Sequence, residues 1–481
     1  MAPDEYVAMD ATSLAAAVRG AELTATEVVA AAIERIEALN GRLNAVTEMA
    51  FEPALESAGR LDVALPLAGV PFLAKDMNID VAGLRLTASC RWLAELPPAT
   101  VDAPLAARWR EAGLMILGRT NLPEWAADFV TEPTWRGPTA NPWDPLRSPG
   151  GSSGGAAAAV ASGMVPVAHG TDSGGSIRVP ASACGLVGLK PSRGLVPVGP
   201  HHDELAGGFD CEHVLSRTIR DSAAMLDLTV GPEPTSRQPF VRGAQRYADG
   251  LGGRLRPLRI GVALRSPGGI EPDDEIGAAV EQVARVLAKA GHAITPFAFP
   301  RETDLGDAAQ VIWMTAIAEE IDCCATRVGR EPRPDELESV MRECIQAGGR
   351  WSAVDYVRAR RACTQATRTL GHACRDLDLL LLPTTATLPP LTGAIDGRTG
   401  AASFAAWSDA AYRYAPYTEL FNATGQPAIS LPLAHSRCGL PIGVQFAAGM
   451  GQDALLLALG AWLEREMPWA ERGLALRRRL L

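Results

Sequence analysis

Apolar and polar positions near the start of the chain repeat with helical spacing. Thr24-Ala-Thr-Glu27 matches the capping-box pattern, in which a hydroxyl and a glutamate satisfy the first backbone N–H groups of a helix. Apolar residues follow at Val29, Ile33 and Ile36, and the pattern stops at Asn40-Gly41. The spacing predicts an amphipathic helix of about fifteen residues that begins after Thr24.

Helical and strand patterns then alternate along the chain. We expect helices over residues 103–112 and 273–290, and strands over residues 114–117, over residues 258–263 and from residue 292. Such alternation indicates an α/β fold with a large mixed, mostly parallel twisted sheet covered by helices on both faces. We expect a single domain over residues 1–481: a helical N-terminal segment (1–60), a core (61–235) and a second half (257–481), with residues 237–256 as a surface connection.

Composition excludes several classes of protein. The chain has 481 residues, 47% of them hydrophobic and 21% charged, and a net charge of −10, which is typical of a soluble globular protein. The one compact basic cluster, Arg477-Arg478-Arg479, is predicted to be a solvated tail, so we expect no nucleic-acid partner. No apolar run is long enough for a membrane span, and the N-terminus lacks a signal-peptide core.

Cysteine and histidine residues give no sign of a metal site or of disulfides. The nine cysteines are scattered, and an odd number without paired spacing predicts reduced thiols and a cytoplasmic protein. His201 and His202 are adjacent, so their side chains point apart, and no further ligand cluster is evident. His169 is expected to be a packed residue. We therefore predict no metal and no cofactor.

Lysine is rare in this chain, which makes each lysine informative. Of the 45 basic residues, Lys75, Lys190 and Lys289 are the only lysines. A desolvated lysine can lose its proton near neutral pH, whereas arginine stays charged. Lys75 ends an apolar run that begins at Pro66, so it is either an amine delivered by a buried strand or a surface lysine at a strand end. Lys190 is expected to be structural, and Lys289 solvated.

Two serines lie in glycine-rich turns that are 24 positions apart. Ser152 belongs to Gly150-Gly-Ser-Ser-Gly-Gly155 and Ser176 to Asp172-Ser-Gly-Gly-Ser-Ile-Arg178, with a short buried helix expected between them over residues 156–163. Glycine allows backbone N–H groups to converge on one point, which is what a developing oxyanion requires. The pattern indicates a serine nucleophile with an oxyanion hole and without a histidine base.

In these motifs the chain resembles the amidase signature family of serine hydrolases. Lys75 and both serine turns agree with the family in order and spacing, as do Thr139-Ala-Asn-Pro-Trp143, Cys184-Gly-Leu-Val-Gly-Leu-Lys-Pro191, Asn422-Ala-Thr-Gly-Gln-Pro-Ala-Ile-Ser-Leu-Pro432 and Gly439-Leu-Pro-Ile-Gly-Val-Gln445. The resemblance spans residues 10–465. It implies one mixed sheet between helices and a Ser–cisSer–Lys triad.

The resemblance also implies a role for each residue of the two turns. Ser176 is the nucleophile, Ser152 the bridging serine on a cis peptide bond after Gly151, and Lys75 the base. The backbone N–H groups of Ser173, Gly174 and Gly175 form the oxyanion hole, and Ser153 is an auxiliary hydrogen-bonding residue or an ordinary turn serine. Arg178 either anchors a substrate carboxylate or pairs with Asp172 to brace the oxyanion loop; we favour the second.

Two functions from different classes follow from the resemblance. The first is hydrolysis of a small-molecule carboxylic amide, cyclic or linear, as in the 6-aminohexanoate cyclic dimer hydrolase branch. The alternative is the A subunit of a glutamyl-tRNA amidotransferase, which works only within a complex. Pro123-Glu-Trp-Ala-Ala-Asp128 and Gly207-Gly-Phe-Asp-Cys211 depart from that subunit's usual sequence. The sequence does not decide whether the protein forms a homodimer.

The substrate pocket cannot be assigned from motifs. Residues 310–361 have helical spacing but no family motif. Eight apolar or aromatic residues could line a pocket or pack in the core: Trp313, Met314, Ile317, Tyr356, Trp407, Tyr412, Tyr414 and Phe421.

Overall fold

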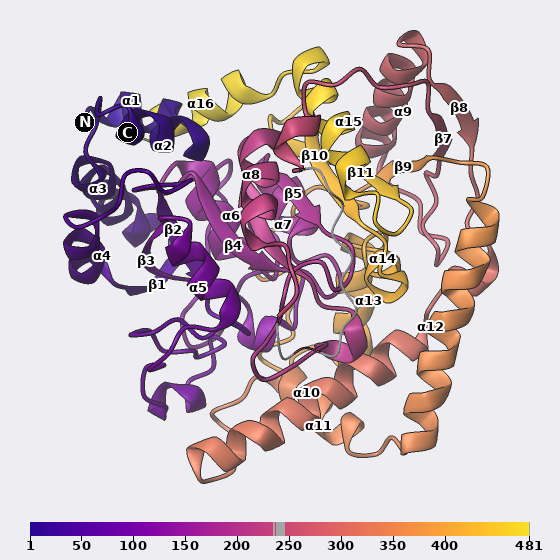
Figure 1. Cartoon of the computed structure of the whole chain (residues 1–481). Helices are drawn as coiled ribbons and strands as arrows, with labels where there is room; N and C mark the ends of the chain where they lie inside the picture. Colours follow the sequence, from indigo (N-terminus) through magenta and orange to yellow (C-terminus); the bar gives the residue numbers. More distant parts are fainter. Residues whose placement is uncertain (234–235, 237–245, 481) are drawn as a thin grey trace.

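The computed structural model is built around one twisted sheet with helices on both sides (Figure 1). It describes all residues except 234–235, 237–245 and 481. Most of the surface connection expected over residues 237–256 therefore lies outside the described residues. The α/β class predicted from the alternating patterns is confirmed.

Eleven strands of the described chain form the sheet, in the order β1-β3-β2-β4-β6-β5-β10-β11-β9-β7-β8. In chain order they are β1 (Val46–Met49), β2 (Pro71–Lys75), β3 (Met115–Thr120), β4 (Val167–Thr171), β5 (Val187–Lys190), β6 (Glu212–Ser216), β7 (Arg259–Val262), β8 (Ala293–Pro296), β9 (Leu379–Pro383), β10 (Ala428–His435) and β11 (Pro441–Ala448).

Sixteen α-helices of the described chain surround the sheet. They are α1 (Pro3–Ala8), α2 (Ala11–Arg19), α3 (Ala25–Leu43), α4 (Phe51–Ala58), α5 (Pro104–Glu111), α6 (Gly154–Ser162), α7 (Arg178–Cys184), α8 (Ile219–Thr229), α9 (Asp274–Lys289), α10 (Asp307–Val328), α11 (Ser339–Gly348), α12 (Ala353–Ala373), α13 (Phe404–Tyr414), α14 (Glu419–Thr424), α15 (Asp453–Glu466) and α16 (Ala470–Arg479).

The sheet is mixed, but it is not mostly parallel as the alternation suggested. Six of its ten strand pairings are antiparallel, and the parallel ones are β2 with β3 and β4, and β7 with β8 and β9. The prediction failed because β5, β6, β10 and β11 lie between the two parallel groups. Their apolar runs are buried like those of parallel strands, so composition does not reveal direction.

Most expected elements are present, and α3 is longer than predicted. Its capping box is formed: Thr24 accepts from the backbone N–H of Glu27, and the Glu27 side chain accepts from Thr24. The helix continues through Asn40-Gly41 and ends at Asn44, which adopts a left-handed conformation with φ of 49°. Asn40 does not stop the helix because its side-chain oxygen accepts from the backbone N–H groups of Ala45 and Val46, beyond the helix end.

The two ends of the chain pack together, which corrects the prediction of a solvated basic tail. Helices α1 and α16 lie side by side (Figure 1). The three arginines are the last turn of α16, and Arg477 is buried, its Nε donating to the carbonyl oxygen of Val7 at 2.9 Å. Arg35 donates to the carbonyl oxygen of Arg477 at 2.7 Å. Composition could not distinguish this arginine from its exposed neighbours.

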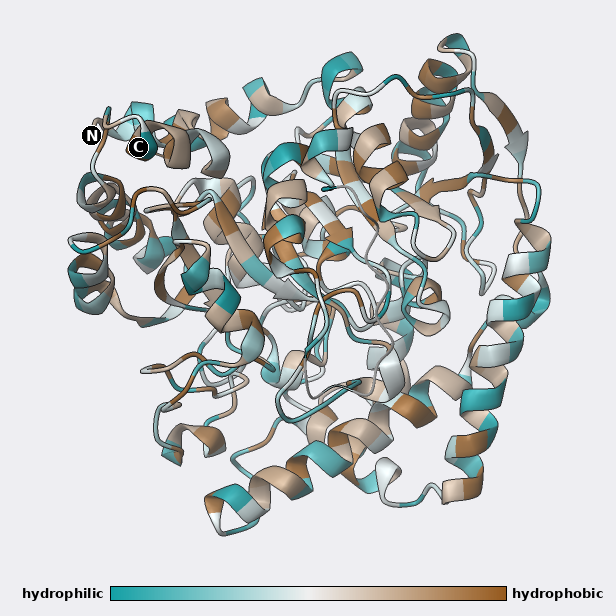
Figure 2. Cartoon of the chain, viewed as in Figure 1, coloured by the Kyte–Doolittle hydropathy of each residue, from teal (hydrophilic) through white to brown (hydrophobic). Residues whose placement is uncertain are grey.

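Helices α10, α11 and α12 project from the sheet: α12 lies on the side of β7 and β8, and α10 and α11 run along the bottom of the view (Figure 1). Hydrophilic residues follow the outer face of α12 (Figure 2), and its buried positions are Ala359, Cys363, Ala366 and Leu370. Ala366 and Leu370 of α12 belong to a buried cluster with Leu380 and Leu382 of β9, and α10 packs on both α11 and α12. Of these three helices, α10 contributes to the wall of the cavity described below, through Gln310, Trp313 and Met314.

Among the described residues, we find no helix with both the length and the apolar composition needed to cross a bilayer.

Candidate functional site

Three strand ends bring the candidate residues to one edge of the sheet. Strands β2 and β4 are parallel neighbours, so their carboxyl ends, at Lys75 and Thr171, lie together. Strand β6 runs antiparallel to β4 and begins at the same edge, with Glu212 opposite Thr171. The loop after β4 carries Ser176, and the two glycine-rich turns therefore meet above this edge.

The amine of Lys75 is buried and bound by hydroxyl groups. Its side chain is 0% exposed, and Nζ lies 2.7 Å from Oγ of Ser152 and 2.7 Å from Oγ1 of Thr171. No ion pair joins this amine to a carboxylate of the described chain. Burial lowers the pKa of Lys75 to about 8, although the nearby carboxylates of Asp210 and Glu212 act in the opposite direction. About half of the amine is therefore deprotonated at about pH 8.

Asp76, the next residue, points away from this amine, as strand alternation predicts. Its carboxylate accepts from the backbone N–H of Thr87 at 2.8 Å and also binds the hydroxyl of Thr87. The guanidinium of Arg119 lies 3.8 Å away, and both residues are buried. Asp76 therefore leaves Lys75 without an ion-pair partner.

A buried acidic cluster beside Lys75 was missed from the sequence. Asn78 donates to Asp210 at 2.6 Å and to Glu212 at 3.0 Å, so the two carboxylates share one amide. Burial and the proximity of Glu212 raise the pKa of Asp210 to about 7, and burial raises that of Glu212 to about 7. The one available signal was a pair of carboxylates, Asp210 and Glu212, flanking Cys211.

His169 is packed, as predicted, and is bound at both ring nitrogens. Nδ1 accepts from the backbone N–H of Lys75 at 3.2 Å, so the proton lies on Nε2, which donates to Glu212 at 2.6 Å. Burial lowers the pKa of His169 well below its usual value. The ring stacks at 4.8 Å on Trp109, in a tilted geometry. A neutral, doubly bound imidazole is a structural support and not a base.

The first serine turn presents Ser152 to the amine. The peptide bond between Gly151 and Ser152 is cis, as the resemblance implies. A side chain at Gly151 would meet the carbonyl oxygen of Asp128 at 2.8 Å, so only glycine fits here. Ser153 donates its backbone N–H to the carbonyl oxygen of Ser176 at 3.1 Å and its hydroxyl to that of Thr171 at 3.3 Å. The backbone of Ser153 thus ties the two turns together.

The hydroxyl of Ser176 makes no hydrogen bond with any described residue. Its side chain is 7% exposed and lines a cavity, whereas Ser152 is fully buried. The structure therefore joins Lys75 to Ser152 directly and places Ser176 beside them through the backbone. Hydrogen bonds of reacting groups are often long or unformed before a substrate is bound.

The loop over residues 173–176 has backbone N–H groups without partners. None of the four donates a hydrogen bond within the described chain. Gly175 has a φ of +142°, and a side chain there would meet Oγ1 of Thr418 at 2.3 Å, so a glycine is required. Thr418 donates to the carbonyl oxygen of Gly174 at 2.5 Å, and the hydroxyl of Ser173 donates to Asp210 at 2.7 Å. The carbonyl oxygen of Gly174 and the side chain of Ser173 are thus anchored, while the N–H groups of the loop are left for a ligand.

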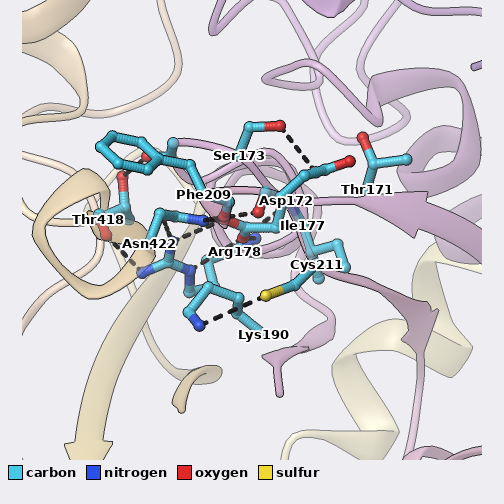
Figure 3. Close-up of polar contacts among 12 residues, drawn as sticks. Thr171, Asp172, Ser173, Ile177, Arg178, Lys190, Phe209, Cys211, Thr418 and Asn422 are labelled. Atoms are coloured by element: carbon cyan, nitrogen blue, oxygen red, sulfur yellow. Dashed lines mark hydrogen bonds and ion pairs between the residues drawn. The ribbon is translucent and has the colours of Figure 1, made fainter. Parts of the chain in front are cut away.

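Arg178 has no donor left for a substrate. Its Nε and Nη2 donate to the two carboxylate oxygens of Asp172, at 2.9 and 2.7 Å, and Nη2 also donates to the side-chain oxygen of Asn422 (Figure 3). Its Nη1 donates to the carbonyl oxygen of Thr418 and to the side-chain oxygen of Gln445. Asp172 also accepts from the backbone N–H of Ile177, and both charged side chains are 0% exposed. All five guanidinium donors are thus used by the protein, which favours the bracing alternative.

A cavity of about 590 Å³, its open mouth included, reaches Ser176. Four of the eight residues that sequence left open line it: Trp313, Met314, Trp407 and Tyr412. Ile317 and Tyr414 pack in the core between α10, α11 and α13, Phe421 packs under the sheet, and Tyr356 lies against α10. The other lining residues are Ala126, Ala127, Asp128, Phe129, Ser173, Gly174, Gln310, Phe404, Ser408, Ala411 and Glu419. The cavity is therefore mainly apolar and aromatic.

The remaining lysines, cysteines and histidines take no part in this site. Lys190 ends strand β5, is buried, and donates to the carbonyl oxygen of Pro191 at 2.9 Å, 3.8 Å from Sγ of Cys211 (Figure 3). Lys289 is exposed. All nine cysteines are free thiols, and within the described part of the chain no cluster of histidine, cysteine and acidic residues could hold a metal ion.

Comparison with known proteins identifies the family of this chain. The family model described as Amidase matches residues 27–457. A 6-aminohexanoate-cyclic-dimer hydrolase of Paenarthrobacter ureafaciens is 37% identical over 96% of both chains. The structure of a 6-aminohexanoate cyclic dimer hydrolase complexed with substrate superposes with a TM-score of 0.90 over 98% of this chain and 99% of that one, at 34% identity.

A bacterial aryl acylamidase of the amidase signature family superposes with a TM-score of 0.87 at 27% identity, over 98% of both chains. The family model covers most of the chain, and the relatives align over nearly all of it. The chain therefore belongs to the amidase family and is a hydrolase of C–N bonds in non-peptide amides.

Proposed function

We propose that the protein hydrolyses a small, mainly apolar carboxylic amide through an acyl-enzyme on Ser176. Lys75 is the base and Ser152 carries the proton between them. The observation that supports this most is the 2.7 Å contact between Nζ of Lys75 and Oγ of Ser152, in a buried site without an ion pair. A neutral lysine that acts through a second hydroxyl can activate a serine.

The proposed reaction uses each of these groups in turn. Ser176 attacks the amide carbonyl as its proton passes to Ser152, whose own proton passes to Lys75. The N–H groups of residues 173–176, which have no other partner in the described chain, stabilise the oxyanion. The amine leaves with a proton returned through Ser152. Water, deprotonated by the same relay, then hydrolyses the ester on Ser176.

We propose oligoamides as substrates on two grounds: the reaction named for the relatives, and the apolar lining of the cavity. The relatives named above include hydrolases of the 6-aminohexanoate cyclic dimer. The cavity beside Ser176 offers aromatic surface to an alkyl chain. No further protein is needed in this mechanism, and the cytoplasmic location remains a prediction.

The test is turnover by the purified chain alone, with the acyl group trapped on Ser176 and located by mass spectrometry. The Ser176→Ala variant should lose at least about a thousandfold in kcat/KM and keep its fold. The exposed Ser57→Ala variant is the matched control. Strict dependence on a partner protein and glutamine would favour the amidotransferase subunit, and normal turnover by Ser176→Ala would end the proposal.

A further inference from the structure

Glu419 places a carboxylate in the otherwise apolar cavity. It is the first residue of α14 and lines the cavity together with Ser176. No lysine, arginine or histidine belongs to the lining that the structure describes. A partly buried carboxylate without a cation beside it costs free energy, so its presence needs an explanation.

The carboxylate is held by one contact and left open on its other side. Tyr412 donates its hydroxyl to Oε1 of Glu419 at 2.7 Å, whereas Oε2 accepts no hydrogen bond from any described residue. Asp128, the second acid of the cavity, differs. Trp407 donates to its Oδ2 at 2.7 Å, and the two N–H groups that follow it in the chain bind its Oδ1. Of these two acids, only Glu419 has a carboxylate oxygen that accepts no hydrogen bond from a described residue.

The carboxylate group that carries this free oxygen lies close to the oxyanion loop. A side-chain carbon built on Gly174 would be 3.9 Å from Oε1 of Glu419. The preceding residue, Thr418, is bound on both sides: its hydroxyl donates to the carbonyl oxygen of Gly174, and its own carbonyl oxygen accepts from Arg178. The backbone beside the carboxylate is therefore anchored to the oxyanion loop, and the gap between the carboxylate and the loop is a few ångströms wide.

We propose that Glu419 determines specificity by accepting a hydrogen bond from a second nitrogen of the substrate, an ammonium or another amide N–H. The proposal deepens the proposed function and rests on it for the identity of the reacting bond. The protein thus selects amides that carry a further N–H donor near the scissile bond, and it disfavours substrates with a free carboxylate there.

The neighbouring side chains suit such a group. Trp313 and Trp407 present aromatic rings to the same cavity, and aromatic faces attract ammonium ions. Burial raises the pKa of Glu419 to about 7, and an ammonium bound against it would favour the ionised form again. The alkyl chain between the two nitrogens would lie on Met314 and Phe404.

Binding of simple ligands tests the proposal without turnover. The tryptophan fluorescence of the whole protein, to which Trp313 and Trp407 of the cavity contribute, is followed while an alkylammonium ion, or the alkanol of equal length, is added. We expect the ammonium to bind roughly tenfold or more tightly than the alcohol, because a hydrogen bond between charged groups is stronger than one from a neutral hydroxyl. The Glu419→Gln variant should lose this preference, and Glu466→Gln, an exposed acid, should keep it.

A second variant covers the case in which Glu419→Gln folds poorly. Tyr412→Phe removes only the hydroxyl that orients the carboxylate, and we expect it to reduce the preference a few-fold. Equal affinity of the wild-type protein for ammonium and alcohol would overturn the proposal. So would an unchanged preference in a folded Glu419→Gln variant.

Turnover separates this proposal from the proposed function. The ratio of kcat/KM is measured for two linear amides that differ only in a terminal ammonium or methyl group. A ratio near one in the wild-type protein, with Ser176-dependent hydrolysis of both, refutes the role of Glu419 and leaves the proposed function intact. Selective ammonium binding without hydrolysis of any amide supports Glu419 and contradicts the proposed function.

Discussion

The protonation of Lys75 sets the pH dependence of the proposed reaction. The base must be neutral to take a proton from Ser152, so activity requires the deprotonated amine. With a pKa of about 8, roughly one tenth of the amine is neutral near pH 7. A lysine with its usual pKa of about 10.4 would be neutral in only about one molecule in 2,500. Burial of the side chain therefore raises the active fraction by about two orders of magnitude.

The assay is kcat/KM for an uncharged amide between about pH 6 and about pH 9.5, where the amide itself does not titrate. We expect a rise of about tenfold per pH unit below an inflection near 8, and a plateau above it. Because Asp210 and Glu212 titrate nearby, the inflection belongs to the whole group of coupled residues. The exposed Lys289→Met variant is the control and should reproduce the wild-type profile.

The Asp210→Asn variant tests whether the charge of Asp210 raises the pKa of Lys75. Asp210 raises the pKa of Lys75, so removing its charge should move the inflection to lower pH, by on the order of one unit. The plateau should also fall, because Asp210 anchors Ser173 of the oxyanion loop. A flat profile in the wild-type protein, or one that falls as pH rises through 8, would refute the reasoning. An inflection that moves upward in Asp210→Asn would refute the assigned coupling.

Three further substitutions test the loop and the amine. Arg178→Lys removes the two-pronged hydrogen bonding of a buried ion pair and should lower the free energy of unfolding by about 3–5 kcal/mol, measured by urea denaturation. A loss under about 1 kcal/mol would contradict the hydrogen-bond network of Arg178. Gly175→Ala forces a side chain against Thr418 and should lower kcat by at least about tenfold with a smaller change in KM, measured by steady-state kinetics; unchanged kcat would show that the loop adapts. Thr171→Val removes one of the two hydroxyls on Lys75 and should lower kcat by about tenfold, and wild-type kinetics would show that this contact does not position the amine.

The polar centre was predicted mainly through the family resemblance. The resemblance implied the contact between Lys75 and Ser152 and the cis bond after Gly151, and the bracing pair of Asp172 and Arg178 was the alternative we favoured. Rarity of lysine pointed to Lys75 because arginine cannot be neutral at this pH.

Features that depend on strand pairing were predicted poorly. The acidic cluster of Asp210 and Glu212 reaches Lys75 because β6 runs antiparallel to β4, and the sheet was expected to be mostly parallel. Arg477 is buried because the C-terminal helix packs on the first one, although its sequence neighbours are arginines. Neither the pairing of β6 with β4 nor the packing of α16 on α1 can be read from the residue types of these segments.

The sequence by itself determined the reacting groups and the turns that hold them, because a glycine at a positive φ or at a close contact leaves its mark on the residue type. Only the tertiary structure decided which distant side chains surround those groups: Thr171 and the two carboxylates beside the amine, and Glu419 and the aromatic rings beside Ser176. The reason is physical. Electrostatic and packing interactions act over a few ångströms in space, and strand order and helix packing set which residues fall within that range.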